Sequence, residues 1–451
     1  MARKASLSGF PELLPQERIV EQHVLDTLRR VFELHGFSSI ETRSVETVAQ
    51  LLRKGEIDKE VYVLGRIHDD ATSSGDAGSR SDQLALHFDL TVPFARYVVE
   101  NSGHLAFPFR RYQIQKAWRG ERPQDGRFRE FVQADIDVVG DGTLAFRYDV
   151  ELALVVVQAL ESLPLPKFRV RVNNRKLAEG FYRGLGLTDT AGVLRSIDKL
   201  DKIGPDKVSA LLREELEASE EQAQSALKLA SICTEDSSFA DQVRALGVSN
   251  DLLEQGIAEL SAVIEEATRR APGKVVADLS IARGLDYYTG TVYETVLVGH
   301  EQLGSVCSGG RYDSLASKGN RTFPGVGLSI GVSRLVSRIL STGAATASRS
   351  VPSAVLVALT DEESWSDAQD VAAKLRTRGI CVEVAGKAEK FGKQIKYADR
   401  RGIPFVWFTS DDGTHEVKDI RSGIQTKADP DLWSPPAEDL LPTISSAEPT
   451  A

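Results

Sequence analysis

The chain has 451 residues, of which 41% are hydrophobic and 27% are charged, and its formal net charge is −10. A chain of this length can bury a large core and is expected to divide into two or three domains. The acidic balance excludes a non-specific nucleic-acid coat, although a local basic surface can still contact RNA.

The cysteines and the apolar runs indicate which cellular compartment to expect. Cys233, Cys307 and Cys381 lie far apart and are odd in number, so they predict neither a disulfide framework nor a zinc site and favour a reducing cytosol. No apolar run approaches ~20 residues, and residues 1–15 lack the apolar centre of a secretory signal. We therefore expect a cytoplasmic protein without a membrane span.

The first predicted elements are a helix and a strand. Residues 16–35 carry apolar side chains close to helical spacing, with Pro15 suited to the first turn and Gly36 to the C-terminal cap. Residues 37–46 predict a strand. A plain amphipathic helix accounts for this pattern as well as a functional motif does.

Residues 84–99 predict a strand that turns into a helix at Pro93. Asp89 and Thr91 lie two residues apart and so share a strand face, where a carboxylate and a hydroxyl can hold an ammonium group. Thr91 can instead cap the helix N-terminus. The residues alone leave both roles open.

The most informative stretch is residues 108–140. Two apolar-rich runs, Arg111–Arg119 and Glu130–Val139, flank a loop of Gly, Pro, Gln, Asp and Arg and predict an antiparallel hairpin. Guanidinium groups that bind phosphate oxygens in bidentate fashion are a usual way to hold a polyphosphate. The arginines that bracket the loop are Arg119, Arg122, Arg127 and Arg129.

The return strand of this hairpin carries Gln133, Asp135 and Asp137 at a period of two, which places them on one face. A carboxylate there can meet a cationic ligand beside the phosphates. The alternative is an exposed hairpin laced with surface charges, which contribute little to stability.

The following segments predict a helix over 143–163, a strand over 167–173 and a mainly helical region over 175–271 that is rich in Glu, Lys, Ala and Leu. We find no catalytic constellation inside this helical region. Residues 275–297 return to strands.

Within these strands, residues 282–290 hold Arg283, which can meet an anion, and Gly284, which permits close backbone approach. Tyr287 and Tyr288 can line a planar polar ligand, although a tyrosine-rich strand also suits a core. Cys307, which has no histidine near it in sequence, is interpreted as a small buried residue rather than a nucleophile.

Residues 323–340 combine a glycine-spaced strand with a helix. Arg334 lies in the first turn of that helix, where it either projects toward a ligand or is an ordinary exposed arginine. Residues 341–350 are small and polar and predict a linker.

Beyond the linker, strands and helices alternate in a compact α/β pattern up to residue 419. A cluster of basic residues lies on and before one helix, as either a phosphate-contact stripe or a solvated helix face. The cluster consists of Lys387, Lys390, Lys393, Lys396, Arg400 and Arg401. The proline-bearing tail is predicted to be disordered.

Several of these segments resemble motifs of the class II aminoacyl-tRNA synthetases. Trp118–Glu121 and Arg127–Phe131 are similar to the second class II motif, and residues 327–335 to the third. The helix and strand over 15–46 resemble the first motif, except that Arg43 replaces its usual proline.

Other segments resemble the histidyl-tRNA synthetases in particular. Phe88–Pro93 is similar to their amino-acid-binding strand, and Ala282–Gly290 and Ser308–Asp313 to two motifs peculiar to that family. Lys393–Ala398 and Val417–Asp419 resemble their anticodon-binding domain.

The resemblance implies an α+β fold, with a class II antiparallel sheet flanked by helices, a helical insertion and a C-terminal α/β anticodon-binding domain. Its expected divisions are catalytic residues 1–174 and 273–341, insertion 175–272, linker 342–352, anticodon-binding domain 353–434 and disordered tail 435–451. It also implies a homodimer.

The resemblance further implies a histidine–tRNA ligase that forms histidyl-adenylate from histidine and ATP and then charges tRNA(His). Magnesium is expected with the ATP phosphates, but no metal fixed by the protein, no prosthetic group, no DNA and no membrane. Arg119 and Arg283 are the implied catalytic residues at the α-phosphate, where fixed guanidinium groups stabilise developing charge.

The remaining implied site residues divide by ligand. ATP would contact Arg119, Glu121, Arg127, Phe131 and Arg334. Histidine would contact Asp89, Thr91, Arg119, Gln133, Asp137, Arg283, Tyr287, Tyr288 and Tyr312. Contacts with tRNA are expected at Arg122, Gln124, Lys393 and Lys396.

One departure and one rival accompany these implications. Asp89 and Asp137 are shorter than the Glu of many bacterial relatives and match eukaryotic-type members. The rival is a histidine-sensing regulatory paralogue of ATP phosphoribosyltransferase. Such paralogues lose the first histidine motif and the anticodon domain, whereas Arg283–Tyr288 and residues 354–421 are present here.

Overall fold

The computed structural model describes residues 7–52, 60–66, 83–282, 287–410 and 412–446. The chain divides into two compact units, Met1–Pro11 with Leu25–Arg338 and Glu12–Val24 with Ile339–Ala451. The sequence does not predict that residues 12–24 group with the C-terminal part. In that unit the Gln16 side-chain nitrogen donates to the Ala347 carbonyl at 2.7 Å.

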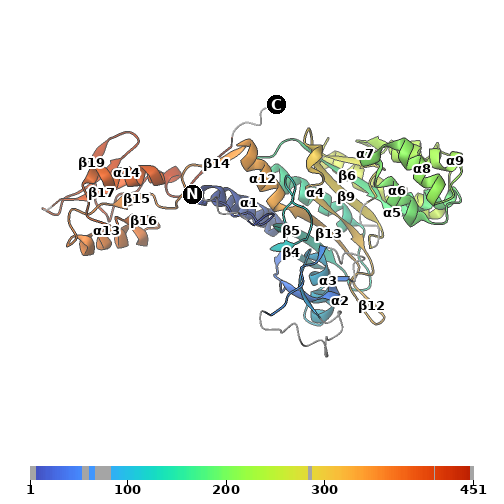
Figure 1. The fold of residues 1–451 in the computed structure, drawn as a ribbon, viewed down its shortest axis with the longest axis horizontal. Coiled ribbons are helices and arrows are strands. Elements are labelled where there is room, and N and C mark those ends of the chain that lie inside the picture. Colours follow the sequence, from blue (N-terminus) through green and yellow to red (C-terminus); the bar gives the residue numbers. More distant parts are fainter. Residues whose placement is uncertain (1–6, 53–59, 67–82, 283–286, 411, 447–451) are drawn as a thin grey trace. The chain divides into compact units, whose positions relative to one another are not determined.

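The first unit is built on a nine-stranded sheet with the order β1-β4-β5-β13-β10-β9-β6-β8-β7 (Figure 1). The pairs β1–β4 and β6–β8 are parallel, and the other pairs are antiparallel. The strands are β1 (Ser38–Ser39), β4 (Phe109–Trp118), β5 (Glu130–Val139), β6 (Phe168–Asn174), β7 (Cys233–Thr234), β8 (Val275–Asp278), β9 (Thr291–Leu297), β10 (Cys307–Tyr312) and β13 (Gly325–Gly331).

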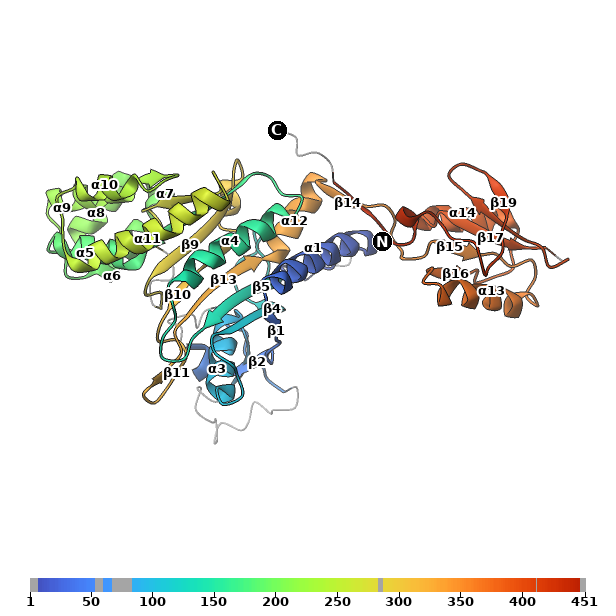
Figure 2. The same cartoon turned by 180° about the vertical axis from the view of Figure 1, so that it is seen from behind.

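Helix α4 (Arg147–Glu161) lies over one face of this sheet, together with the parts of α1 (Pro15–Leu34) and α12 (Val332–Thr342) that belong to the first unit (Figure 2). Because side chains alternate along a strand, Ala134, Ile136 and Val138 of β5 share one face and are fully buried. Gln133, Asp135 and Asp137 occupy the other face, as the period of two predicts.

The predicted central hairpin forms, and its register places Trp118 opposite Glu130 and Arg111 opposite Asp137. Residues 37–46, however, do not form one strand. The chain leaves the large sheet after β1, and β2 (Val45–Thr47) instead pairs with β3 (Leu84–Leu86) in a separate two-stranded sheet.

The strand face predicted for Asp89 and Thr91 is also wrong. Strand β3 ends at Leu86, and Thr91 is the first residue of α3 (Thr91–Asn101). The backbone N–H of Val92 donates to Asp89 Oδ1 at 3.1 Å. Asp89 thus accepts one of the unpaired N–H groups of the first helical turn and lies at the start of α3 rather than on a strand.

Residues 175–271, predicted to be mainly helical, consist mainly of helices, apart from the short strand β7. Helix α11 packs against α4, α5, β6 and β8, so it joins the helical region to the sheet. The helices are α5 (Arg175–Gly184), α6 (Thr190–Ile197), α7 (Leu200–Ile203), α8 (Pro205–Glu215), α9 (Glu220–Ala230), α10 (Phe239–Arg244) and α11 (Asp251–Arg270). Smaller elements of the first unit are α2 (Val48–Leu51), η4 (Glu301–Leu303), β11 (Ser317–Lys318) and β12 (Arg321–Thr322).

The second unit contains a five-stranded sheet in the order β16-β15-β17-β18-β19. Trp407 lies fully buried in its core. Its elements are β15 (Val355–Val357), α13 (Trp365–Thr377), β16 (Val382–Val384), α14 (Phe391–Arg401), β17 (Phe405–Thr409), β18 (His415–Asp419) and β19 (Gln425–Lys427). This alternation of strands and helices is the predicted α/β pattern.

The predicted linker and tail contain more structure than expected. Strand β14 (Ala345–Ala347) lies within the linker and pairs with β20 (Ile444–Ser446) of the tail, after the short helix η5 (Ala437–Asp439). The buried Arg349 donates to the Asp439 carbonyl at 2.9 Å. Disorder is therefore wrong for residues 435–446, because backbone pairing and a buried guanidinium hold them; residues 447–451 lie outside the described part.

Among the described residues, no helix combines the length and the apolar content needed to cross a membrane.

Candidate active site

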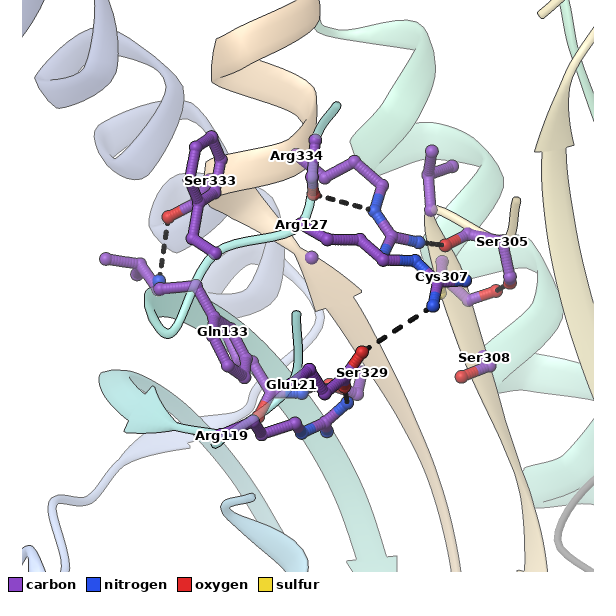
Figure 3. A pocket seen from close by; sticks show the side chains of 16 residues that line it. Arg119, Glu121, Arg127, Gln133, Ser305, Cys307, Ser308, Ser329, Ser333 and Arg334 are labelled. Carbon is purple, nitrogen blue, oxygen red and sulfur yellow. Dashed lines mark hydrogen bonds and ion pairs between the residues drawn. The ribbon is translucent and has the colours of Figure 1, made fainter. Parts of the chain in front are cut away.

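A cavity of about 140 Å³ lies where the loop of the central hairpin meets β5, β10, β13 and the start of α12. Figure 3 shows its side chains converging from these elements. Six residues predicted to contact ligands line it, namely Arg119, Glu121, Arg127, Phe131, Gln133 and Arg334. Segments about 200 residues apart in sequence thus meet at one site.

The loop is shaped so that its backbone reaches the helix across the cavity. Gln124 and Arg127 exchange backbone hydrogen bonds of 3.2 and 3.0 Å around a tight turn. Gly126 has a φ of +65°, a backbone conformation that residues other than glycine rarely adopt. A Cβ at this position would also lie 3.0 Å from Arg334 Cγ. Glycine therefore permits both the turn and the close approach of Arg334.

The cavity carries an excess of positive charge. The side chains of Arg119 and Arg127 each lie 3.6 Å from a Glu121 carboxylate oxygen, one on either oxygen (Figure 3). Arg334 is the third arginine lining the cavity, and Glu121 is its only acidic residue within the described part of the chain. Three guanidinium groups against one carboxylate make a site for an anion with several oxygens.

Arg334 is held from two sides. Its Nε donates to the Gly126 carbonyl at 3.1 Å, and Nη1 donates to the Ser305 carbonyl (Figure 3). Burial, together with the positive charges of Arg127 and Arg119, lowers the pKa of Arg334 to about 10. An anion in the cavity would relieve this repulsion, so the site favours a ligand such as phosphate.

Arg119 and Phe131 form one wall. The Arg119 guanidinium carbon lies 5.1 Å from the centroid of the Phe131 ring, and its Nε donates to the Phe88 carbonyl at 3.0 Å. The backbone N–H of Trp118 donates to the His87 carbonyl at 3.1 Å, which places residues 87–89 beside the end of β4. The segment that contains Asp89 is thereby brought next to Arg119, although Asp89 and Thr91 do not line the cavity.

Gln133 lies at the cavity wall beside strand β13. Its amide nitrogen donates to Ser329 Oγ at 2.7 Å. Its oxygen, Oε1, is buried and accepts no hydrogen bond from the residues that the structure describes. A buried acceptor without a donor is costly, so Gln133 is a site where a ligand N–H would be favourable.

Further along the same face of the sheet, Asp137 is almost fully buried, at 3% exposure. The Tyr312 hydroxyl donates to Asp137 Oδ1 at 2.7 Å, and Arg111 Nη2 lies 2.6 Å from Oδ2. Burial, followed by the charge of Asp137, holds the pKa of Tyr312 well above its usual value, so this hydroxyl stays protonated and donates.

Tyr287 and Tyr288 lie beside this carboxylate. Their ring centroids are 4.2 Å apart, and both rings pack against the buried cluster that contains Tyr312. A Cβ on Gly310 would lie 2.9 Å from the Tyr288 ring, and a Cβ on Gly325 would lie 2.5 Å from the Tyr312 ring. The glycines of β10 and β13 thus make room for these aromatic side chains.

Other predicted residues lie elsewhere. Arg122 and Gln124 are exposed on the hairpin loop, and Lys393 and Lys396 are exposed on α14 of the second unit. Arg129, interpreted from sequence as one of the phosphate-binding arginines, does not line the cavity; instead its side chain donates to the carbonyls of Glu121 and Ser8. Arg283 lies outside the described residues.

Sequence reasoning missed several residues of the site. The cavity is also lined by Ser305, Cys307, Ser308, Ser329 and Ser333. Small polar residues carry no signal of their own, but β13 could be aligned with β5 once both strands were predicted, which would place Ser329 opposite Asp135. Cys307 is buried as predicted, and burial raises the pKa of its thiol, which disfavours the reactive thiolate.

Comparison with known families gives two matches. The sequence model described as histidyl-tRNA synthetase matches residues 9–335, and the one described as anticodon binding domain matches residues 353–429. The first covers the large sheet, the helical region and the cavity, and the second covers the five-stranded sheet.

Individual relatives agree with the family matches. The chain is 70% identical to a histidine–tRNA ligase of Micrococcus luteus, over 99% of this chain and 100% of that protein. It is 59% identical to a histidine–tRNA ligase of Cutibacterium acnes, over 98% of this chain and 99% of the relative.

Solved structures show the same fold. The histidyl-tRNA synthetase of Nostoc sp. PCC 7120 superposes with a TM-score of 0.81 at 36% identity, covering 95% of this chain and 97% of that one. A protein of Bacillus halodurans C described as an ATP phosphoribosyltransferase regulatory subunit/histidyl-tRNA synthetase has a TM-score of 0.70 at 20% identity, covering 87% of this chain and 96% of its own.

Proposed function

Because the chain belongs to the histidyl-tRNA synthetase family, its activity is that of a histidine–tRNA ligase, and we propose that the arginine-lined cavity and the Asp137 cluster form the two ends of its active site. The reaction joins histidine and ATP to give histidyl-adenylate and pyrophosphate, and then transfers histidine to the 3′ end of tRNA(His).

The observation that carries the assignment of the ATP end is the charge of the cavity. Three arginines, Arg119, Arg127 and Arg334, surround a space in which Glu121 is the one carboxylate from the described residues. In the proposal, Arg127 contacts the outer phosphates and Arg119 the α-phosphate. Adenine stacks between Phe131 and Arg334. ATP enters as its magnesium complex, since a polyphosphate in a site of this kind is neutralised partly by metal and partly by fixed cations.

The histidine end is assigned to the face of the sheet beside this cavity. Asp137, with Tyr287, Tyr288 and Tyr312 around it, would surround the imidazole ring. Gln133 with Asp89 and Thr91 would hold the ammonium group. The unpaired Oε1 of Gln133 supports its part, because it is an acceptor and an ammonium group is a donor. Hydrogen-bonded pockets of this type reject ligands that lack the matching nitrogens.

The proposed chemistry is direct attack by the histidine carboxylate on the α-phosphorus of ATP, with pyrophosphate as the leaving group. Arg119, and Arg283 by its position in the family motif, would stabilise the negative charge that grows on the α-phosphate oxygens in the transition state. Cys307 lines the cavity, but burial raises the pKa of its thiol, so a protonated thiol and not a nucleophile faces the ligand.

The proposal extends to the partners and the compartment. Arg122 and Gln124 on the hairpin loop would contact the acceptor end of the tRNA, and Lys393 and Lys396 on α14 would contact its anticodon arm. We further propose a homodimer formed through the first class II motif, whose strand β1 lies at the open edge of the nine-stranded sheet. Three free cysteines suit a reducing cytoplasm.

A regulatory role without catalysis is the alternative function. The relatives named as histidine–tRNA ligases reach 70% identity, whereas the structure whose description includes a regulatory subunit is 20% identical. The segment around Tyr287 and the C-terminal unit, which are expected to be absent from such paralogues, are both present. These observations favour the ligase.

The experiment that tests the site assignment is histidine-dependent ATP–pyrophosphate exchange without tRNA. Arg119→Ala and Arg283→Ala are expected to abolish exchange while histidine still binds. The matched control is Arg321→Ala, which removes an exposed arginine paired with Asp141 on the β12 hairpin. Exchange that survives loss of Arg119 would refute the assignment of the α-phosphate site.

A further inference from the structure

Arg111 is a fully buried arginine on β4 that none of the roles above uses. Its register places it opposite Asp137 on the paired strand β5. Its guanidinium carbon lies 4.0 Å from the centroid of the Phe94 ring, so the group is also stacked on one face. Burying a guanidinium is costly unless it is paired, and its pairing therefore indicates what it does.

Arg111 forms ion pairs with two acidic residues of β5, and its Nη1 donates to Gln113 Oε1 at 3.5 Å. Its Nη2 lies 2.6 Å from Asp137 Oδ2 and 4.0 Å from Asp135 Oδ2. Asp135 and Asp137 are 2% and 3% exposed and share one strand face. Two buried carboxylates on one strand face repel one another and favour taking up a proton, and a guanidinium within 4.0 Å of both opposes this.

The orientation of Asp137 is also fixed. Arg111 engages Oδ2, the Tyr312 hydroxyl donates to Oδ1, and a Cβ on Gly327 would lie only 1.9 Å from Oδ1. A carboxylate oxygen has two lone-pair sites, so one contact of this kind does not by itself prevent it from accepting a ligand N–H. A carboxylate held in this way accepts a ring N–H, whereas a protonated carboxyl group would also donate.

We propose that Arg111 is a positioning residue for histidine selection: it keeps Asp137 ionised and aimed, so that the pocket accepts a ligand with a ring N–H. This inference rests on the proposed role of Asp137 as the partner of the imidazole. Arg111 itself contacts neither histidine nor ATP in this account and acts through Asp137.

The test compares Arg111→Met with the wild type in pyrophosphate exchange. The KM for histidine is expected to rise roughly 10- to 100-fold, because Asp137 loses a buried ion-pair partner, while the KM for ATP stays within about twofold. The ratio of kcat/KM for histidine over that for 2-thiazolylalanine, which lacks a ring N–H, is expected to fall. A merely structural defect would not change this ratio.

Arg110→Met is the matched control. Arg110 is the neighbouring residue on β4, faces the opposite side of the sheet and pairs with Glu151 at 2.6 Å. Its loss removes an arginine and an ion pair from the same strand without touching Asp137, so both KM values should stay near those of the wild type. A histidine-specific rise in Arg110→Met would overturn the proposal.

A double-mutant cycle with Asp137→Asn separates this inference from the function on which it rests. If Asp137→Asn leaves the histidine KM unchanged, the proposed role of Asp137 fails and the inference with it. If Asp137→Asn raises it but Arg111→Met does not, the inference alone is overturned. We expect each single change to raise the KM for histidine, and Arg111→Met to raise it little further when Asp137 is already replaced by Asn. Additive effects of the two changes would overturn the proposal.

If Arg111→Met does not fold, Arg111→Gln replaces it in the same cycle. Glutamine removes the charge but keeps a hydrogen-bond donor for Asp137, so it leaves the buried carboxylates with a polar neighbour. The expected and the contradicting results are the same as for methionine. An equal rise in the KM values for histidine and ATP would indicate a structural role and overturn the proposal.

Discussion

Replacing Gly327 with alanine is the most direct test of how closely the histidine pocket is built. Gly327 lies on β13 opposite Asp137, and an added Cβ would lie 1.9 Å from Asp137 Oδ1 and 2.5 Å from its carboxyl carbon. Such atoms need more than about 3 Å, so the carboxylate must move by roughly 1 Å. Arg111 and Tyr312 hold it on both oxygens, so it cannot turn away without losing one of them.

A displacement of about 1 Å at a substrate-positioning group costs on the order of 100-fold in rate. We therefore expect Gly327→Ala to lower kcat/KM for histidine about 100-fold, equivalent to about 2.7 kcal/mol of transition-state stabilisation. Overpacking should also lower the free energy of unfolding by about 1–3 kcal/mol. The KM for ATP should change little, because the arginine-lined cavity does not include Gly327.

The assay is pyrophosphate exchange with histidine varied at saturating ATP, combined with thermal unfolding. Gly103→Ala is the control, because a Cβ there meets no atom within 4 Å. Near-normal histidine activation by Gly327→Ala would refute the reasoning, since it would mean that Asp137 can move without consequence and does not select the ligand.

Three further changes test other parts of the account. Arg334→Ala should raise the KM for ATP about tenfold in exchange assays with little effect on that for histidine, because one of three cavity cations is lost; an unchanged ATP KM would contradict its role. Iodoacetamide at neutral pH should label the exposed Cys233 before the buried Cys307, because burial keeps the reagent away from the Cys307 thiol. Peptide mass spectrometry would show the order, and faster labelling of Cys307 would be the contrary result. Deleting residues 436–451 should lower the melting temperature of the C-terminal unit by several degrees, as measured by calorimetry, because the buried Arg349 loses its hydrogen bond to the Asp439 carbonyl. An unchanged melting temperature would show that the tail does not stabilise this unit.

The sequence predicted the central hairpin well because its signals are local. Two apolar-rich runs around a loop of turn residues predict the hairpin, and a period of two on the return strand places Gln133, Asp135 and Asp137 on one face; β4 and β5 pair as predicted. The C-terminal α/β alternation was predicted for the same reason. Each of these elements carries its own pattern and its own boundary residues.

Predictions failed where tertiary contacts decide local structure. Asp89 accepts a helix N–H instead of lying on a strand face, and residues 37–46 divide between two sheets. A propensity argument detects neither feature. Arg111 gave no signal because a buried arginine is visible only through its partners. The tail is ordered through pairing with β14, about 100 residues earlier in the chain.

The central claim is that this chain activates histidine and transfers it to tRNA(His). The most direct measurement is ATP–pyrophosphate exchange with each of the amino acids in turn, followed by charging of tRNA(His) with labelled histidine by the same preparation. The account predicts exchange with histidine alone and transfer of that histidine to the tRNA. Histidine binding without exchange, or exchange with another amino acid, would contradict it.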